Sequence, residues 1–299
     1  MKNIYSRLIE GISEPFRRLA PSEQVFLENH DFYLDRVTPT RTLSLSLTDA
    51  TCHQDCAHCN GHYLKGMQPF SRLSQVDLSA YDAVLISGGS SKSGEVPIKE
   101  HISNILQLPK RLQLNLHPGY QNAENLLPLA SRNPVVSFDL PGKDSVISEV
   151  FGLPYLCADY RGLFTDYCKK FKTVAHITIG LDYGTDSGEE GTIDFLAEQK
   201  PVEVVFLVFR PTPGTRMQNA PVPELARVLD VLKKAQKSLT CPVLLGCMRP
   251  SGPYRRDLDI LAWMHGIRKI VMPDHTLLQT LNDTGIKVNG FGNCCALNC

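Results

Sequence analysis

Short apolar runs rich in β-branched residues recur along this chain of 299 residues. Eight of them have the length of buried strands, at 43–48, 83–89, 112–118, 135–140, 174–181, 202–210, 243–248 and 269–272. Between them, apolar residues repeat with helical spacing at 98–108, 122–131, 192–200, 223–238 and 255–265. Strands that alternate with helices predict βαβ units and a parallel sheet. Eight units predict an α/β fold of the closed (β/α)8 TIM-barrel type, which typically occupies about 250 residues.

The pattern begins near residue 41 and ends near residue 284. We therefore expect an N-terminal extension at 1–40, the barrel at 41–284 and a cysteine-containing C-terminal tail at 285–299. An open doubly wound sheet is the alternative fold. Its first βα turn usually carries a glycine fingerprint, whereas here that turn carries cysteines, which favours the barrel.

The charge balance excludes two classes of partner. Lys and Arg together number 31, as do Asp and Glu, so the formal net charge is zero. This gives no bulk attraction to nucleic acid or to an anionic membrane, and no apolar stretch reaches the roughly 18 residues that span a bilayer.

No signal-peptide core is present at the N-terminus, so we expect a cytoplasmic protein. In a reducing compartment, ten cysteines indicate metal or redox chemistry.

Three cysteines follow the first predicted strand. Cys52, Cys56 and Cys59 have the spacing C-x3-C-x2-C on one short loop. Three thiolates can hold three irons of a cubane cluster and leave the fourth iron open. A structural zinc site needs four closed ligands, which His53 and His58 can complete in the alternative reading.

The cysteine spacing resembles the signature of the radical S-adenosylmethionine superfamily, with His58 in the aromatic-type position before the third cysteine. The resemblance implies a [4Fe-4S] cluster at Cys52, Cys56 and Cys59 whose open iron binds S-adenosylmethionine. It also implies an electron from a reductant such as ferredoxin or flavodoxin, and formation of a 5′-deoxyadenosyl radical.

Residues at the ends of the later strands extend the resemblance. Gly88 and Gly89, followed by Ser90, resemble the glycine-rich element that binds the methionine amino group, although Ser90 replaces an acidic residue. His117 ends the third strand, where a cofactor contact and a satisfied rim histidine are both open. Gly180 resembles the backbone patch that accepts adenine, with a structural kink as the competing explanation.

Three further residues extend the likeness to biotin synthase. Asp139 matches an aspartate near the S-adenosylmethionine ribose and the substrate, and Ser137 stands where biotin synthase has an asparagine. Arg249, after the seventh strand, resembles an arginine ligand of an auxiliary cluster. The more common role of such an arginine is to bind a carboxylate.

The tail carries Cys294, Cys295 and Cys299 within six residues. Because thiolates favour iron–sulfur clusters, we expect a flexible metal-binding segment rather than an inert tail. If the tail climbs back from the bottom of the barrel, these cysteines can hold an auxiliary [4Fe-4S] cluster above it.

These motifs indicate the branch of biotin synthase and lipoyl synthase. The chain lacks the upstream cysteines and the C-terminal serine motif of single-chain lipoyl synthases, and it resembles a subunit of the two-component, archaeal-type enzyme. This implies sulfur insertion into an octanoyl chain on a lipoyl carrier protein, and a homologous partner subunit. The alternatives are another biotin-synthase-like enzyme acting on a small molecule, a non-catalytic cluster-binding partner, and a zinc module.

Overall fold

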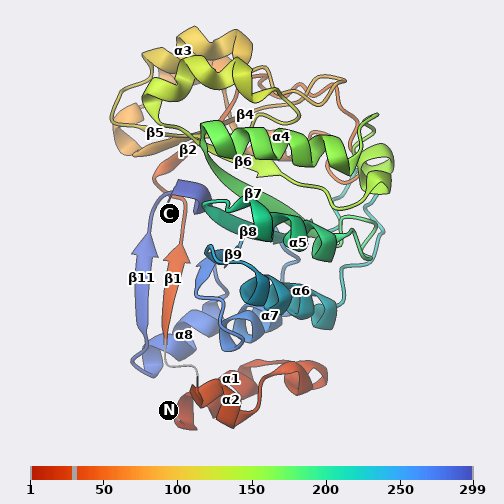
Figure 1. Ribbon diagram of the computed structural model, residues 1–299. Helices are drawn as coiled ribbons and strands as arrows, with labels where there is room; N and C mark the ends of the chain where they lie inside the picture. The colour runs from red at the N-terminus through yellow and green to blue at the C-terminus, as the bar shows by residue number, and fades with distance from the viewer. Residues whose placement is uncertain (1, 29–31, 298–299) are drawn as a thin grey trace.

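The computed structural model describes residues 2–28 and 32–297. Within them, eleven strands form one curled sheet in the order β11-β1-β10-β9-β8-β7-β6-β5-β4-β2-β3, and every neighbouring pair is parallel (Figure 1). The strands are β1 (Tyr33–Val37), β2 (Thr42–Ser46), β3 (Gln68–Pro69), β4 (Ala83–Ser87), β5 (Gln113–Leu116), β6 (Val135–Asp139), β7 (Lys172–Ile179), β8 (Glu203–Val208), β9 (Val243–Leu245), β10 (Lys269–Val271) and β11 (Lys287–Phe291).

Helices cover the outer face of this sheet. The α-helices are α1 (Lys2–Gly11), α2 (Glu23–Glu28), α3 (Ile102–Gln107), α4 (Cys157–Lys170), α5 (Glu189–Gln199), α6 (Leu225–Ser238), α7 (Pro253–Met264) and α8 (His275–Asp283). Shorter helical turns are η1 (Glu14–Leu19), η2 (His62–Gly66), η3 (Phe70–Gln75), η4 (Leu78–Ala80), η5 (Lys99–His101), η6 (Ala123–Arg132), η7 (Val146–Val150) and η8 (Cys295–Leu297). No helix in the described part of the chain is long and apolar enough to cross a membrane.

All eight predicted strands are present as β2 and β4–β10, which confirms a parallel α/β sheet curled like a TIM-type barrel. The described sheet has eleven strands in a half-barrel, so the predicted count of eight is not confirmed. The strand β1, which was assigned to the extension, pairs with β10 at the position where a closed barrel would pair β10 with β2. The strand β11, assigned to the tail, pairs with β1 on its other side. As a result, β11 and the two-residue strand β3 form the edges of the sheet among the described residues.

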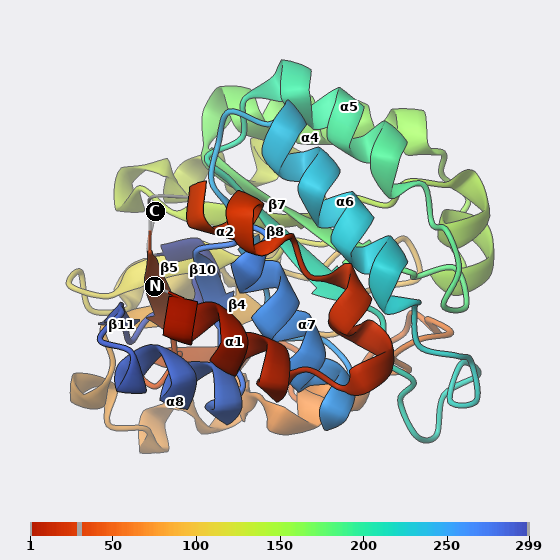
Figure 2. The same cartoon turned by 90° about the horizontal axis from the view of Figure 1, so that it is seen from below.

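The N-terminal helices pack beneath α7 and α8 (Figure 2). Phe26 of α2 lies with its ring 6.0 Å from that of Trp263 in α7. The Trp263 indole donates a hydrogen bond to the carbonyl of Tyr33, 2.9 Å away, at the start of β1. This contact connects the N-terminal helices to the sheet.

Helix α4 was missed, because the sequence analysis assigned no helix to its segment. The buried residues of α4 are Tyr160, Phe164 and Tyr167, which repeat at helical spacing. Their rings pack on Phe138 of β6, with centroids 5.5–6.1 Å apart. Aromatic spacing was the available signal for this helix, and the charged residues between the rings obscured it.

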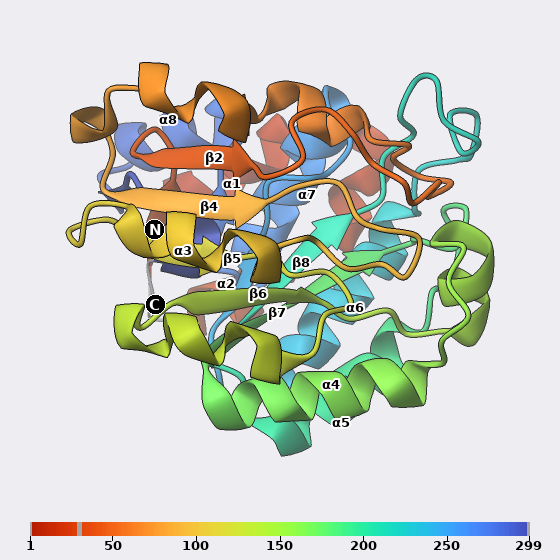
Figure 3. The same cartoon turned by 90° about the horizontal axis from the view of Figure 1, so that it is seen from above.

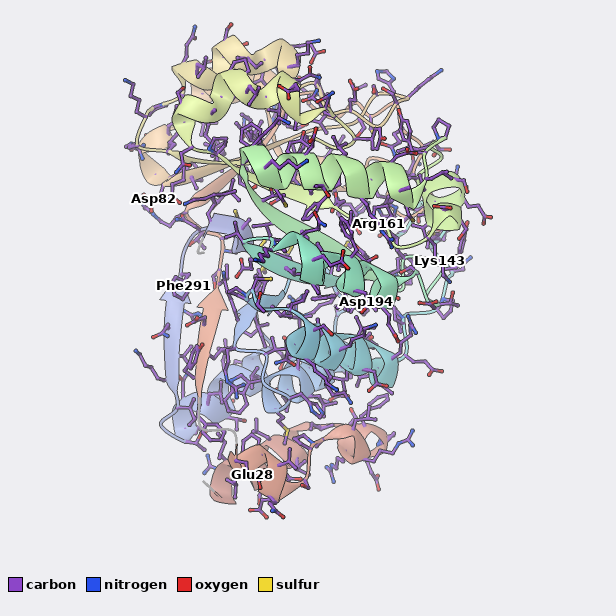
Figure 4. All side chains as sticks on the ribbon, viewed as in Figure 1. Glu28, Asp82, Lys143, Arg161, Asp194 and Phe291 are labelled. Carbon is purple, nitrogen blue, oxygen red and sulfur yellow. The ribbon has the colours of Figure 1, made fainter. Side chains whose placement is uncertain are left out.

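The end of the chain enters the curl of the sheet from the side of β1 and β2. Phe291 ends β11 (Figure 4), and the Arg41 N–H then donates to the carbonyl of Gly292, 2.8 Å away, in the link between β1 and β2. Ala296 packs inside the sheet with a buried apolar group comprising Val37, Val174, Val205, Leu244 and Val271. We call Cys294–Leu297 the tail turn, and it lies toward the amino ends of β5–β8.

Candidate functional site

The cysteine loop, residues 52–59, follows β2 at the carboxyl end of the parallel strands. Figure 3 shows β2, β4 and β6 pointing toward the side where this loop and the loop after β8 gather. The carboxyl ends of barrel strands are where active sites of this architecture are built. The placement is therefore the one expected for catalytic chemistry.

Neighbouring loops fix the cysteine loop from two sides. The Ala57 N–H donates to the carbonyl of Val150 in η7, 2.7 Å away, and the Gln54 side chain donates to the carbonyl of Phe151 at 3.1 Å. From the loop after β8, Arg216 forms an ion pair with Asp55 and donates to its carbonyl at 2.7 Å. Two separate parts of the chain, the backbone at Val150 and Phe151 and the side chain of Arg216, thus hold the cysteine loop in place.

The glycine turn after β4 supports the same loop. A Cβ on Gly89 would lie 2.0 Å from the carbonyl oxygen of Thr51 and 2.6 Å from the Cα of Cys52, so no larger residue fits without displacing the loop. The His53 N–H donates to the carbonyl of Ser90, 2.9 Å away, and the Ser90 N–H donates to the Cys52 sulfur at 3.4 Å. This close approach explains why residue 89 is a glycine. The next residue, Ser90, faces the adjoining cavity.

The donor set fits an iron–sulfur cluster. Burial, followed by the nearby thiols of Cys59 and Cys52, raises the pKa of Cys56, and burial also raises the pKa of Cys59. A bound metal reverses this penalty because it deprotonates its thiol ligands. Within residues 2–28 and 32–297, no three His, Cys, Asp or Glu side chains are close enough to hold a single metal ion. A cubane cluster binds each thiolate at a different iron, whereas a structural zinc site needs four ligands around one ion.

A cavity of about 320 Å³ lies beside the cysteine loop, inside the curl of the sheet. Ligand-binding cavities typically begin near 300 Å³. Its polar lining comes from the cysteine loop, from β4–β7 or the residues that directly follow them, and from α4. It includes Cys56, His58, Cys59, Ser90, His117, Asp139, Tyr160, His176 and Thr178. Ser90, His117 and Asp139, which lie at the carboxyl ends of three neighbouring strands, come together in this lining.

Burial shifts the pKa values of two titratable groups in the cavity in the direction that favours their neutral forms. Asp139 is open to the cavity but surrounded by protein, and this desolvation raises its pKa to about 6. Burial lowers the pKa of His58 to about 4, and its ring lies 5.8 Å from that of Phe151. The Nδ1 atom of His58 has no hydrogen-bond partner among the described residues. The Asp139 carboxyl group and Nδ1 of His58 can both form hydrogen bonds with a bound molecule. They suit a polar ligand such as a ribose or an amino acid moiety.

Three residues expected to bind the cofactor lie in the supporting structure. Ser137 is buried, with its hydroxyl donating to the Asn115 side chain at 2.9 Å. Gly180 has φ of 76°, and a Cβ there would lie 2.2 Å from the Pro223 ring, so the structural kink accounts for it. None of the three lines the cavity.

Arg249 is the third of these residues, and it is fully buried. Its guanidinium makes a two-pronged ion pair with Asp259 at 2.8 Å and donates to the carbonyls of Gly246 and Met272. Asp259 in turn accepts from the N–H of Asp274, 2.8 Å away. Arg249 therefore joins β9, α7 and the end of β10, and it does not face the cavity.

The tail cysteines lie below the cavity, and the expectation of a position above the barrel was wrong. The Asn115 amide of β5 donates to the Cys294 sulfur, 3.3 Å away, and the Cys295 sulfur lies 3.9 Å from Nε2 of His176 in β7. Figure 4 shows sulfur atoms gathered beside the tail turn, inside the curl of the sheet. The error arose because β11 was not foreseen. Cys299 lies outside the described residues.

The sequence interpretation gave no role to His176, Tyr160 or Asn115. His176 shares strand parity with Thr178 and Val174, and all three side chains face the interior of the curl. A histidine and a threonine on the buried face of a strand are the signal that identifies such lining residues. Tyr160 was hidden in the helix that was not predicted.

Comparison with solved structures shows the fold. Methylornithine synthase (PylB) superposes with a TM-score of 0.56 at 12% identity, covering 95% of this chain and 97% of that one. Streptococcus suis SuiB bound to S-adenosylmethionine gives 0.51 at 14% identity, covering 78% of this chain and 55% of that one. No protein-family model and no curated protein sequence matches the chain. The chain thus shares its fold with these two proteins.

Proposed function

We propose that this chain is a radical S-adenosylmethionine enzyme. The observation that carries the proposal is the position of Cys52, Cys56 and Cys59 beside a polar cavity at the carboxyl end of a curled parallel sheet. When bound by these thiolates, a [4Fe-4S] cluster with one open iron supplies the electron that releases a 5′-deoxyadenosyl radical from S-adenosylmethionine. The fold shared with a protein solved with S-adenosylmethionine supports the same assignment.

The chain's own residues bind and orient the cofactor in this proposal. Ser90 and the adjacent glycine turn present polar groups beside Cys52, where the methionine moiety binds. Asp139 accepts hydrogen bonds from the ribose hydroxyls, because its position in the cavity matches the one implied by the resemblance to biotin synthase. His58 packs on Phe151 and closes the wall of the cavity next to Cys59.

We further propose that the reaction is sulfur insertion into an octanoyl chain on a lipoyl carrier protein. The 5′-deoxyadenosyl radical would take a hydrogen atom from C6 or C8 of the octanoyl chain, and sulfide from an auxiliary cluster would form the new C–S bond. Cys294 and Cys295, whose contacts with Asn115 and His176 put them next to the cavity, would hold that cluster together with Cys299. A homologous partner subunit and a reductant such as ferredoxin or flavodoxin complete this proposal. A second candidate is a radical enzyme acting on a small molecule, which the full-length fold likeness to methylornithine synthase favours.

The test uses the anaerobically reconstituted chain with dithionite, S-adenosylmethionine and an octanoylated lysyl peptide. We expect 5′-deoxyadenosine by chromatography and a peptide mass gain of one or two sulfur atoms. Cys56→Ala abolishes both, and Cys168→Ala, which alters a half-buried thiol of α4, leaves both unchanged.

The two levels of the proposal fail separately. Absence of 5′-deoxyadenosine from a protein that carries its iron contradicts the radical assignment. Formation of 5′-deoxyadenosine without a sulfur adduct, even with the partner subunit added, contradicts sulfur insertion and leaves the small-molecule candidate.

A further inference from the structure

Three tyrosine rings form a continuous chain from the cavity to the protein surface. Tyr160 of α4 lines the cavity, and its ring centroid lies 4.8 Å from that of Tyr120, which lines the same cavity in the loop after β5. The Tyr120 ring stacks on Tyr155, with centroids 3.7 Å apart and planes inclined by 17°. The Tyr155 hydroxyl donates to the carbonyl of Ser93, 3.3 Å away, at an exposed position. We call Tyr160, Tyr120 and Tyr155 the tyrosine chain.

Packing accounts for the Tyr160 ring but not for its hydroxyl. The ring lies on Phe138, with centroids 6.1 Å apart, and the residue is 5% exposed. Buried tyrosine hydroxyls usually find a hydrogen-bond partner, as that of Tyr167 in the same helix does at the carbonyl of Gln121, 2.8 Å away. Within residues 2–28 and 32–297, the hydroxyl of Tyr160 makes no hydrogen bond. It is therefore left to interact with whatever occupies the cavity.

The two inner phenols keep their protons at neutral pH. Burial, followed by the charge of Asp139, raises the pKa of Tyr160, and burial also raises the pKa of Tyr120. The charge of Cys56 acts on Tyr160 as well, so this hydroxyl lies near the cysteine loop. A phenol O–H bond is weaker than the C–H bonds of a methyl group. Tyr160 is thus a hydrogen-atom donor beside the place where a carbon radical is formed.

We propose that the tyrosine chain discharges a 5′-deoxyadenosyl radical that forms when no substrate is in place, and so protects the cavity from damage by that radical. The inference rests on the radical assignment of the proposed function, and it adds a second fate for the radical. The geometry suits this role because the chain begins in the cavity and ends at the surface.

Each step of this discharge moves one hydrogen atom or its equivalent. The carbon radical takes the hydrogen atom of the Tyr160 hydroxyl, so a C–H bond forms, the O–H bond breaks and a phenoxyl radical remains on Tyr160. An electron and a proton then pass from Tyr120 to Tyr160, and afterwards from Tyr155 to Tyr120. At the surface, one electron from a reductant of the ferredoxin or flavodoxin class and one proton from water restore Tyr155.

The first test follows the transferred hydrogen atom. In D₂O a tyrosine hydroxyl carries deuterium, whereas carbon-bound hydrogens of the protein do not exchange. The anaerobically reconstituted full chain is incubated in D₂O with dithionite and S-adenosylmethionine, without substrate, and the 5′-deoxyadenosine is analysed by mass spectrometry. We expect one deuterium atom in most of the product, and a severalfold smaller share from Tyr160→Phe. The matched change Tyr167→Phe, in the same helix but outside the cavity lining, keeps the original share.

The second test follows the radical along the chain. Reduced protein freed of excess dithionite is mixed with S-adenosylmethionine and frozen, and electron paramagnetic resonance detects the tyrosyl radical, which ring-deuterated tyrosine identifies by a narrower signal. Tyr120→Phe keeps a ring between the other two tyrosines but has no hydroxyl to oxidise. We therefore expect the radical to remain on Tyr160 in this variant and to live severalfold longer.

The outcomes separate this inference from the radical assignment. Equal deuterium content in the unchanged chain and in Tyr160→Phe overturns the inference and leaves the radical assignment intact. A radical whose lifetime is the same with and without Tyr120→Phe overturns the transfer beyond Tyr160. Absence of 5′-deoxyadenosine from the iron-loaded unchanged chain contradicts the proposed function, and this inference with it.

Discussion

The cysteine loop places its thiols in the lining of the cavity, whereas the tail turn places its thiols behind His176, and the two regions are held by different means. The loop after β2 carries its three thiols within eight residues, and loops from other strands hold it in place. The tail turn carries two described thiols, and the interior faces of β5 and β7 provide their polar contacts. Local spacing draws attention to both groups of cysteines, but only the pairing of β11 with β1 and the hydrogen bond from Arg41 to Gly292 bring the second group inside the sheet.

The two regions also differ in their surroundings. The cysteine loop borders the cavity mouth and is tied by an exposed ion pair between Arg216 and Asp55. The tail turn is closed by apolar side chains and hydrogen-bonded to buried amides. We therefore expect changes at one region to leave the other largely intact.

The largest effect is expected from Gly89→Ala. Its new Cβ would meet the Thr51 carbonyl and displace Cys52, so the loop loses its iron and 5′-deoxyadenosine formation falls to background. Iron bound by the tail turn is retained, and total iron measures both outcomes. Gly66→Ala is the control, because nothing lies within 4 Å of its new Cβ. Loss of all iron in Gly89→Ala would show that the two regions are coupled.

A change in the supporting structure, away from both regions, comes next. Arg249→Met leaves Asp259 buried without its partner and lowers the free energy of unfolding by about 3–5 kcal/mol, measured by urea denaturation of the metal-free chain. Lys233→Met breaks the exposed pair with Asp230 and costs at most about 1 kcal/mol. Equal losses from the two variants would contradict the supporting role of Arg249.

Asn115→Leu tests the hydrogen bond that holds the tail turn, and so whether the tail turn and the cysteine loop are independent. It removes the amide that donates to the Cys294 sulfur, at a cost of about 1–2 kcal/mol in binding the tail iron, or roughly tenfold in affinity. Competition with a chelator measures the loss, and iron at the cysteine loop is unchanged. Ser137→Ala, which removes only the support of Asn115, produces a smaller loss. An effect of Asn115→Leu on both irons would argue against separate sites.

The smallest effect concerns pH. Burial raises the pKa of Asp139 to about 6 from the ordinary value of 3.8, so the folded chain binds a proton more tightly than the unfolded chain. This group therefore contributes stability below pH 4 that is lost as the pH rises to about 6. The difference in unfolding free energy between the metal-free wild type and Asp139→Asn should change across this window. A difference that is constant from pH 4 to 7 would contradict the shift.

Much of the fold follows from local patterns. The eight predicted strands are all found because buried parallel strands consist of continuous apolar runs, and the amphipathic helices between them repeat at helical spacing. The strands β1 and β11 were missed because their sequences mix charged and polar residues, Lys287 and Asp35 among them. Each forms by pairing with a neighbour far away in sequence, which no local pattern reports.

The candidate site divides in the same way. Cys52, Cys56, Cys59 and the glycine turn with Gly89 could be read from the sequence, since short loops keep their ligands together whatever surrounds them. Ser137, Gly180 and Arg249 were assigned to the cofactor from strand position, yet contacts with Asn115, Pro223 and Asp259 engage them elsewhere.

The sequence by itself determined the strands β2 and β4–β10, most of the helices between them and the placing of three thiols after the first strand of the predicted barrel. Both depend on periodicity and on spacing within a few residues. Only the tertiary structure decided that the tail thiols meet His176 and Asn115 beneath the cavity. The physical reason is that a curled sheet with β1 inserted beside β10 lets the end of the chain pass Arg41 and pack its last turn inside.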